Sequence, residues 1–294
     1  MRGRWQAAFA TALLSVTAMM LPPLNYLASG VIALTTLRMG PREGAKVVTA
    51  TLIVFALLAA VLLGQLWVAG LILLSSWLPV FLATLALGYT RSLATAVLTA
   101  SGLGLLTVLL MHLLVPDLTG WWRSILEPFM AALSEQPGWQ LDESQTAEMT
   151  TNLSVMMTGL VAAGVSFNAV VGLIIGRIWQ SQLYNPGAFG SEFRQLSLGR
   201  PAAIMTAVLM GVALTPLSES FRLLVNCLPP LLVAFGIQGL AIVHAIVKLG
   251  QKSKGWLVAM YVLLVIMLPQ MVMMLATLGV LDQWFNFRKR SRAE

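Results

Sequence analysis

The sequence predicts an all-α protein, a polytopic transmembrane helical bundle of about eight or nine helices. Hydrophobic residues make up 58% of the 294 residues and charged residues only 10%, whereas a soluble globular domain carries roughly 25% charged residues. The mean hydropathy of +0.85 leaves too little polar surface to cover an exterior that faces water. We therefore expect a single integral membrane domain over residues 1–294, with lipid around most of it.

The predicted helices are apolar stretches, because a helix needs about 20 apolar residues to cross the hydrocarbon core. These stretches cover residues 6–21, 24–37, 46–64, 66–89, 92–115, 152–179, 201–216, 221–248 and 256–281. Pro22 and Pro23 separate the first two, since proline removes a helical hydrogen bond. The first stretch starts like a signal peptide, but no small-residue cleavage site follows it, so we expect an uncleaved helix. Gly172 and Gly176 form a GxxxG pair that predicts a close helix approach.

Lysines and arginines are distributed along the chain in a pattern that predicts its topology. They lie at the N-terminus, in the GPREG turn, at Arg91, along residues 177–200 and in the turn that follows residue 248. Residues 116–150 instead carry six acidic residues and a single arginine. We expect a multi-pass protein with a cytoplasmic N-terminus and with residues 116–150 outside. Nine full spans would then place Arg288 and the basic tail outside, so either one segment is re-entrant or incomplete, or the tail is an exception.

The outside loop, residues 116–150, is predicted to contain an amphipathic helix. Trp121, Ile125, Phe129 and Leu133 recur every four residues. That spacing gives a helix one apolar face, and tryptophan suits the headgroup zone of a bilayer. The helix is expected to lie at the interface and cap the bundle, with a partner site as the alternative.

Polar side chains inside apolar stretches are the candidate substrate-binding groups, because each must find a partner in hydrocarbon. Glu219, Arg222 and Asn226 stand at i, i+3 and i+7, so a helix would place them on one face. Gln238 lies further along the same stretch, and Asn168 on the preceding long stretch is a candidate partner. We expect these side chains either to clamp helices together or to line a site for a small polar solute.

Residues 177–200 are predicted to be a cytoplasmic interfacial segment. A helix is expected to end near Arg177 and Trp179, whose side chains anchor well at an interface. An Asn-Pro-Gly turn at 185–187 then precedes a short amphipathic helix. The segment is either a membrane-surface connector or a docking face for a partner, since aromatic and arginine residues are enriched at interface cores. The candidate partner-binding residues are Arg177, Trp179, Tyr184, Phe189 and Phe193.

The sequence lacks the motifs of common catalytic sites: GxSxG, HExxH, a Walker A lysine loop and CxxC do not occur. His112 and His244 lie in different apolar stretches, and Cys227 is the only cysteine, so neither a metal site nor a disulfide is expected. We expect no enzyme activity and no cofactor. The net charge of +7 comes from basic loops, so the expected partners are the lipid bilayer, other membrane subunits or a small-molecule solute, and not nucleic acid.

Four stretches of the chain resemble the YybS-like family of bacterial polytopic membrane proteins. They are LNYLASGVIALTTLRMGPREG (24–44), GRIWQSQLYNPGAF (176–189), VNCLPPLLVAFGIQGLAIVHAIV (225–247) and LGVLDQWFNFRKR (278–290). The resemblance implies a protein of the bacterial cytoplasmic (inner) membrane, and the family brings no agreed activity or functional residues.

A more distant resemblance concerns the segment from Pro23 through the Gly40-Pro41 turn. It is similar to the start of the S-components of energy-coupling-factor vitamin transporters, whose general fold the cell-shape protein MreD is thought to share. This resemblance implies an S-component-like core, a small-molecule pocket near the outer leaflet and docking to a coupling protein through the first helices. The additional helices and residues 116–150 depart from the six-span pattern of an S-component.

Two functions remain open from the sequence. The first is a solute-binding or transport-related component without its own ATPase. The alternative is a non-transporting membrane scaffold or assembly protein of the MreD type, which would act through residues 116–150 and 177–200. A cavity lined by the candidate polar side chains would favour the first function, and mutual hydrogen bonding of these side chains would favour the second.

Overall fold

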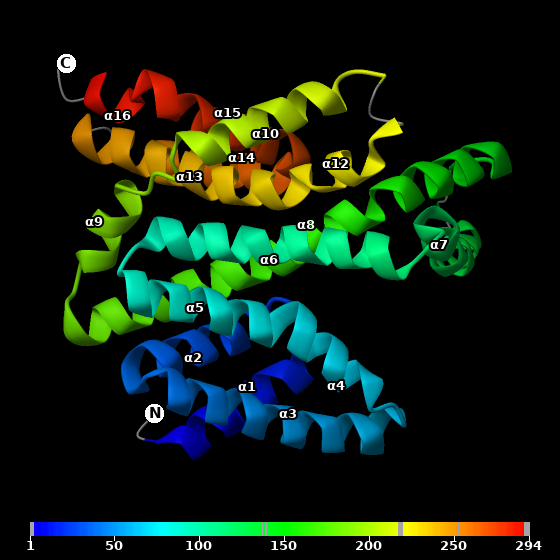
Figure 1. Ribbon diagram of the computed structural model, residues 1–294, viewed down its shortest axis with the longest axis horizontal. Helices are drawn as coiled ribbons and strands as arrows, with labels where there is room; N and C mark the ends of the chain where they lie inside the picture. Colours follow the sequence, from blue (N-terminus) through cyan, green and yellow to red (C-terminus); the bar gives the residue numbers. More distant parts are fainter. Residues whose placement is uncertain (1–2, 137, 139, 217–219, 252, 291–294) are drawn as a thin grey trace.

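The structure is a computed structural model, and it describes residues 3–136, 138, 140–216, 220–251 and 253–290. Throughout these residues the regular structure is helical. Most of the helices run roughly along the long axis of the molecule, packed side by side (Figure 1). The predicted all-α class is therefore confirmed.

The N-terminal half contains six helices and one π-helical turn. They are α1 (Arg4–Thr17), α2 (Leu24–Met39), α3 (Pro41–Leu63), α4 (Trp67–Ile72), η1 (Leu73–Trp77), α5 (Leu78–Thr90) and α6 (Leu93–Leu114). The break between α1 and α2 includes the two predicted prolines. Helices α4 and α5 are continuous through η1, as the stretch 66–89 predicts.

The C-terminal half begins with a helix at the predicted amphipathic loop. The helices here are α7 (Leu118–Ser134), α8 (Glu143–Tyr184), α9 (Ala188–Arg194), α10 (Arg200–Ala213), α12 (Arg222–Asn226), α13 (Leu228–Leu249), α14 (Gly255–Ile266), α15 (Leu268–Phe285) and α16 (Phe287–Arg290). Helix α8 has 42 residues, or about 63 Å at 1.5 Å per residue. It is therefore about twice as long as a hydrocarbon core of about 30 Å is thick.

Within the described residues, five helical stretches are long and apolar enough to cross a membrane, judged by length and composition. They are Pro41–Val61, Trp67–Thr90, Leu93–Leu114, Glu143–Tyr184 and Arg222–Leu249. Helices α10 and α14 are shorter apolar helices of 14 and 12 residues. The fold is compatible with a membrane protein, and the count of eight or nine spans stays a prediction.

Small residues set the distance between the central helices α2 and α8. A Cβ atom on Gly176 would lie 2.5 Å from Ala33 Cβ and 2.8 Å from the backbone nitrogen of Leu34. One turn earlier, a Cβ atom on Gly172 would lie 2.5 Å from Ser29 Cβ. The GxxxG pair therefore makes the close helix approach that its spacing predicts.

A second close approach, between α13 and α15, involves Gly239 and Gly279. A Cβ atom on Gly239 would overlap the backbone of Leu275, and one on Gly279 would overlap the carbonyl oxygen of Phe235. These glycines are 40 residues apart in the sequence, so their contact could not be predicted from a local spacing pattern.

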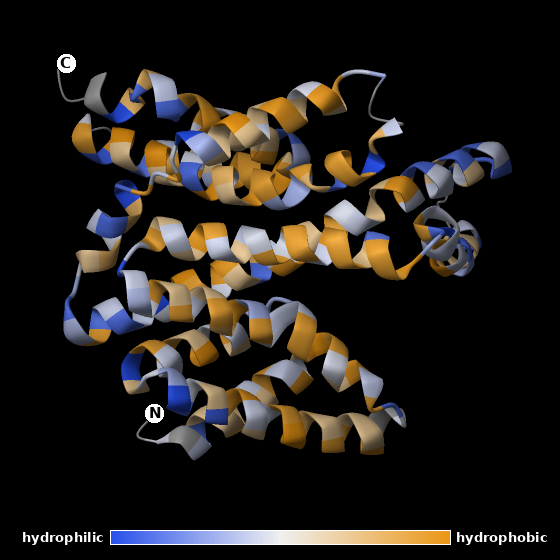
Figure 2. Ribbon diagram, viewed as in Figure 1, coloured by the Kyte–Doolittle hydropathy of each residue, from blue (hydrophilic) through white to orange (hydrophobic). Residues whose placement is uncertain are grey.

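Hydrophilic residues gather at two opposite ends of the bundle, and the part between them is mostly hydrophobic (Figure 2). The N-terminus, α9 and the C-terminus lie at the left end of Figure 1, and α7 lies at the right end. We call the left end, which includes Arg91, Arg194, Lys248 and Arg288, the basic end. The right end, formed by α7 and the start of α8, is the acidic end.

The last apolar stretch, predicted as one helix over 256–281, is two helices. Met267 leaves the helical region at φ −124° and ψ 51°, and Pro269 lies in the first turn of α15. Arg288, after α15, then shares a cavity wall with Lys248, at the end of α13. The chain thus returns to the end of the bundle at which α14 began. An interrupted last segment was one of the predicted alternatives, and with it Arg288 stays beside the other basic residues.

Candidate functional site

Asn168, in the middle of α8, is part of a polar cluster that joins α8 to α2 and η1. Its Oδ1 accepts hydrogen bonds from Asn25 Nδ2 at 3.0 Å and from Ser29 Oγ at 3.3 Å. Its Nδ2 donates to Ser76 Oγ at 2.9 Å, and Asn25 Nδ2 donates to the same hydroxyl at 3.1 Å. Asn168 is only 5% exposed. Both ends of its amide are therefore occupied by side chains of this chain.

The π-helical turn η1 places Ser76 in this cluster. A π turn adds one residue to each hydrogen-bonded ring, and such turns are frequent at functional sites. The neighbouring Trp77 is fully buried and meets Phe55 edge-on, with ring centroids 5.6 Å apart. Among the described residues, the indole nitrogen of Trp77 has no hydrogen-bond partner. The turn thus directs the hydroxyl of Ser76 into the Asn168 cluster and leaves the indole N–H of Trp77 in an apolar environment.

Asn226, at the end of α12, is buried against α8. Its Oδ1 accepts a hydrogen bond from the backbone nitrogen of Gly159 at 2.8 Å. Its Nδ2 lies 3.4 Å from the carbonyl oxygen of Val155 and donates to that of Arg222 at 3.0 Å. Residues 155 and 159 supply the acceptor and donor of one i to i−4 step of α8. The amide of Asn226 therefore attaches α12 to the backbone of α8.

Gln238 is completely buried and joins three parts of the C-terminal half. Its Oε1 accepts from the backbone nitrogen of Leu198, in the connection between α9 and α10, at 2.8 Å. Its Nε2 donates to the carbonyl oxygen of Gly279, on α15, at 2.8 Å. Like Asn168, Gln238 is paired at both ends of its amide.

Arg222 is the first residue of the short helix α12. Phe221 has φ −114° and ψ 48°, so α12 begins only at Arg222. The described part of the predicted common face, Arg222 and Asn226, lies on this short helix, and its extension to residue 219 stays a prediction. The exposed Arg222 Nη1 donates to Thr119 Oγ1 at 3.2 Å. Glu219 lies outside the described residues.

The candidate substrate-binding residues do not converge on one space. Asn168 bonds toward the N-terminal half, Asn226 toward the backbone of α8, and Gln238 toward α15. None of the cavities that we describe below has any of these side chains on its wall. The arrangement consists of separate helix clamps.

Arg177, among the candidate partner-binding residues, is held by neighbouring side chains. Its Nε donates to Glu192 Oε2 at 2.9 Å, and its Nη2 lies 2.8 Å from the same oxygen. Its Nη1 donates to Gln180 Oε1 at 2.7 Å. Since α8 continues to Tyr184, Arg177 is not at the end of a helix as predicted. The ion pair connects α8 to α9.

The predicted aromatic contact residues lie in different environments. Phe189 and Phe193 stack with ring centroids 5.6 Å apart, and Phe193 meets the ring of His244 on α13 edge-on at 5.7 Å. Both phenylalanines are half-buried against the core, and Trp179 packs against a cluster of residues from α1, α2 and α3. Only Tyr184 is mainly exposed, at 61%. The segment is thus largely attached to the bundle, and Tyr184 projects from it.

A polar cavity of about 390 Å³ opens at the basic end between the α5–α6 turn, α8 and α9. Arg91, Arg177, Gln180 and Glu192 contribute to its wall. Arg91 has φ +57°, a left-handed conformation that is uncommon for a residue with a side chain. From the sequence, Arg91 was predicted only as a marker of topology, and its left-handed conformation could not be predicted.

At the acidic end, α7 packs on α8 through Trp122, which lies beside the predicted apolar face, while most of that face is exposed. Trp122 is buried and donates from Nε1 to Thr158 Oγ1 at 2.8 Å. Trp121 and Phe129 are exposed by 42% and 60%. A cavity of about 800 Å³ between α7 and α8 is lined by Arg123 and by carboxylates that include Glu127. The exposed aromatic side chains suit a helix at a membrane surface.

A capping box starts α8 at the acidic end. The backbone nitrogen of Gln145 donates to Asp142 Oδ1 at 2.8 Å, and the Gln145 side chain accepts from the Asp142 backbone nitrogen at 3.1 Å. The bonds from Gln145 and Ser144 lower the pKa of Asp142 from its ordinary value of 3.8. The cap is thus formed by the ionised carboxylate.

A buried ion pair near the C-terminus was missed by the sequence analysis. Asp282 is 4% exposed, and its Oδ2 lies 2.6 Å from Arg288 Nη2. Its Oδ1 accepts from the backbone nitrogen of Phe287 at 3.0 Å. Arg288 also donates to the carbonyl oxygens of Arg194 and Leu196 at 3.0 and 2.9 Å. The pair attaches the C-terminal residues to the segment after α9.

No family model matches this chain, and comparisons with curated proteins and with solved structures found no match. The resemblance to the YybS-like family therefore stays a prediction.

Proposed function

We propose that this chain is a non-enzymatic scaffold or assembly protein of the bacterial cytoplasmic membrane, with its basic end in the cytoplasm. The main support for this proposal is that the side-chain amides of Asn168 and Gln238 each form hydrogen bonds through both their oxygen and their nitrogen to other parts of the chain. A solute-binding component needs convergent polar groups that the solute itself satisfies. Here the polar groups hold helices together at separate places, as the scaffold alternative predicts.

The orientation rests on the distribution of basic residues. Helices α9 and α16, which contain Arg194 and Arg288, lie at the same end as the N-terminus (Figure 1). Lys248 shares a cavity wall with both arginines, and Arg91 shares another with Glu192 of α9. Cytoplasmic loops of membrane proteins carry an excess of lysine and arginine. The split between α14 and α15 keeps the described end of the chain on this side as well. Both termini are therefore proposed to be cytoplasmic.

The contact surface of the scaffold is proposed to lie around α9. Tyr184 is exposed there, and the cavity with Arg91 and Arg177 on its wall lies beside it. Arginine and tyrosine are enriched among the residues that dominate binding energy at interfaces. The ion pair from Arg177 to Glu192 fixes α9 against α8, so this surface is presented in a defined orientation.

Site-specific photo-crosslinking in native membranes tests the proposal. A photoreactive residue at Tyr184 should capture one defined membrane or cytoplasmic subunit in proportion to the amount of this protein. The same residue at Phe129, equally exposed but at the acidic end, is the matched control and should not capture that subunit.

Native mass spectrometry of the purified protein tests the alternative, a solute-binding function. A small polar solute that co-purifies with the wild-type chain and is lost in Asn168→Ala, while the circular dichroism spectrum is unchanged, would establish the solute-binding function instead. Equal capture of the same subunit from Tyr184 and from Phe129 would also contradict the proposal.

A further inference from the structure

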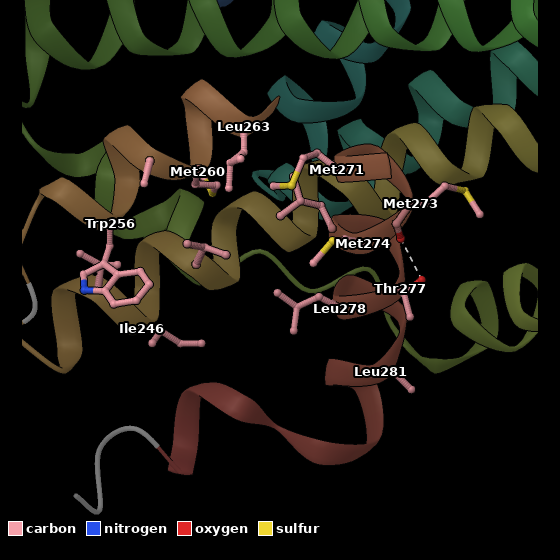
Figure 3. A pocket seen from close by; sticks show the side chains of 14 residues that line it. Ile246, Trp256, Met260, Leu263, Met271, Met273, Met274, Thr277, Leu278 and Leu281 are labelled. Carbon is pink, nitrogen blue, oxygen red and sulfur yellow. Dashed lines mark hydrogen bonds between the residues drawn. The ribbon is translucent and has the colours of Figure 1, made fainter. Parts of the chain in front are cut away.

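The largest apolar cavity that we describe lies between α13, α14 and α15 and has a volume of about 790 Å³. Met260 and Leu263 project into it from α14, and Met271, Met274 and Leu278 project from α15 (Figure 3). The only polar side chains on its wall are those of Thr277 and the indole of Trp256. Methionine side chains adapt to irregular and flexible partners, so the wall suits a flexible apolar occupant.

Helix α14 covers this cavity only loosely. Met260 is the one residue of this helix that is buried. Its 12 residues extend over about 18 Å, a little more than half of a hydrocarbon core of about 30 Å. Helix α14 therefore spans about one membrane leaflet, measured from the basic end.

Basic and aromatic side chains mark the end of the cavity where a lipid headgroup would lie. Lys248 directly follows Val247, which is on the wall, and Lys254 precedes the wall residue Trp256 by two positions. Both lysines are exposed, and Trp256 is 64% exposed. Tryptophan prefers the headgroup level of a bilayer, and lysines close to a membrane surface attract anionic lipids.

A second cavity at the same end adds to the positive charge. It has a volume of about 540 Å³, and Lys248, Arg194 and Arg288 contribute to its wall. Asp282 is the one carboxylate there, and it is paired with Arg288. Lys248 and Arg194 therefore leave a net positive charge beside the apolar cavity.

We propose that the cavity between α13, α14 and α15 binds an anionic phospholipid of the leaflet at the basic end, with its acyl chain against α14 and α15 and its phosphate near Lys248 and Lys254. A transmembrane helix of a partner fits the wall less well, because membrane helices associate through small residues. Ala259 and Thr277 are the only small wall residues. This inference does not depend on the proposed scaffold function.

Native mass spectrometry in neutral detergent tests the proposal with phosphatidylglycerol and phosphatidylcholine of identical acyl chains. The wild-type protein should bind phosphatidylglycerol more tightly. Lys248→Gln and Lys254→Gln should each reduce this preference roughly fivefold, the equivalent of about 1 kcal/mol per cation near a membrane surface. Arg42→Gln, which removes an exposed charge at the same end but away from the cavity, should leave the preference unchanged.

The apolar part of the site is tested by filling the cavity. Ala259→Trp introduces a large side chain from an exposed wall position of α14 and should reduce binding of both lipids. Val258→Trp is the matched control, because Val258 is on the same helix but not on the wall. The proposal would be overturned if both tryptophan variants lost lipid binding equally. It would also be overturned if Arg42→Gln lost the preference for phosphatidylglycerol as much as the lysine variants do, or if the wild-type protein did not distinguish the two lipids. Release of a bound polypeptide instead of lipid by Ala259→Trp would also overturn it.

Discussion

The side-chain oxygens of Gln238 and Asn226 each accept a hydrogen bond from a backbone N–H at 2.8 Å, yet the structure predicts different costs for removing the two side chains. In Gln238→Ala, the backbone nitrogen of Leu198 loses the acceptor it has at 2.8 Å. Leu198 is 5% exposed and lies in the connection between α9 and α10. Leu198 lies outside the helices, so its N–H is not part of an i to i−4 helical ladder. An unsatisfied buried donor costs about 1–3 kcal/mol.

The corresponding loss in Asn226→Ala should be smaller. Its partners, the N–H of Gly159 and the carbonyl of Val155, are the donor and acceptor of one helical step of α8. They can therefore bond to each other when the side chain is removed. The remaining cost is the contact between helices, for which hydrogen bonds in membrane proteins average about 0.6 kcal/mol.

Equilibrium unfolding in mixed micelles, followed by circular dichroism, measures both changes. Gln238→Ala should lower the free energy of unfolding by about 0.4–2.4 kcal/mol more than Asn226→Ala, a factor of about 2 to 60 in the unfolding equilibrium. If Gln238→Ala does not accumulate, Gln238→Met removes the hydrogen bonds with a smaller loss of volume. Equal costs for the two sites, or a larger cost at Asn226, would refute the assignment of orphaned backbone groups.

Three further predictions concern helix packing, capping and topology. Gly176→Ala should destabilise the protein because its Cβ would overlap Ala33, whereas Gly164→Ala, with open space around it, should be neutral or stabilising; thermal unfolding compares them, and equal shifts would contradict the packing. The pKa of Asp142 is lowered in the folded state, so its contribution to the stability of the start of α8 is complete above about pH 5 and is lost as the pH falls through the folded pKa. Asp142→Asn should remove this acid dependence from hydrogen exchange at the start of α8. An unchanged pH profile in this variant would exclude the cap as its source. In a background without the native cysteine, a membrane-impermeant maleimide added to intact cells should label Glu135→Cys and not Asn286→Cys; labelling of both would contradict the proposed topology.

The positions of the helices could be predicted from the sequence because hydrophobic runs and prolines act locally. The break at Pro22 and Pro23 and the small-residue contact of Gly176 follow from their own neighbourhoods in the sequence. The partner of each buried polar group could not be predicted in this way. Asn168 was assigned to the later helices, and it bonds instead to Ser76, 92 residues earlier, because the crossing of α2 and α8 brings η1 to that side. Which face of α8 meets which helix depends on the whole packing arrangement.

The last apolar stretch shows how charge and backbone chemistry resolve an ambiguity together. Hydropathy alone favours one helix over 256–281, and that helix would carry Arg288 to the acidic end. Pro269 has no backbone N–H to donate to residue 265, so α14 loses a hydrogen bond just where Met267 leaves the helical region. The 12 residues of α14 are too few to cross about 30 Å of hydrocarbon. The chain can therefore turn back within the bundle, and Arg288 reaches Asp282 and the carbonyl oxygen of Arg194 at the basic end. The same turn leaves α14 apart from α13 and α15 along one leaflet, so the cavity between these helices follows from the break that the basic tail requires.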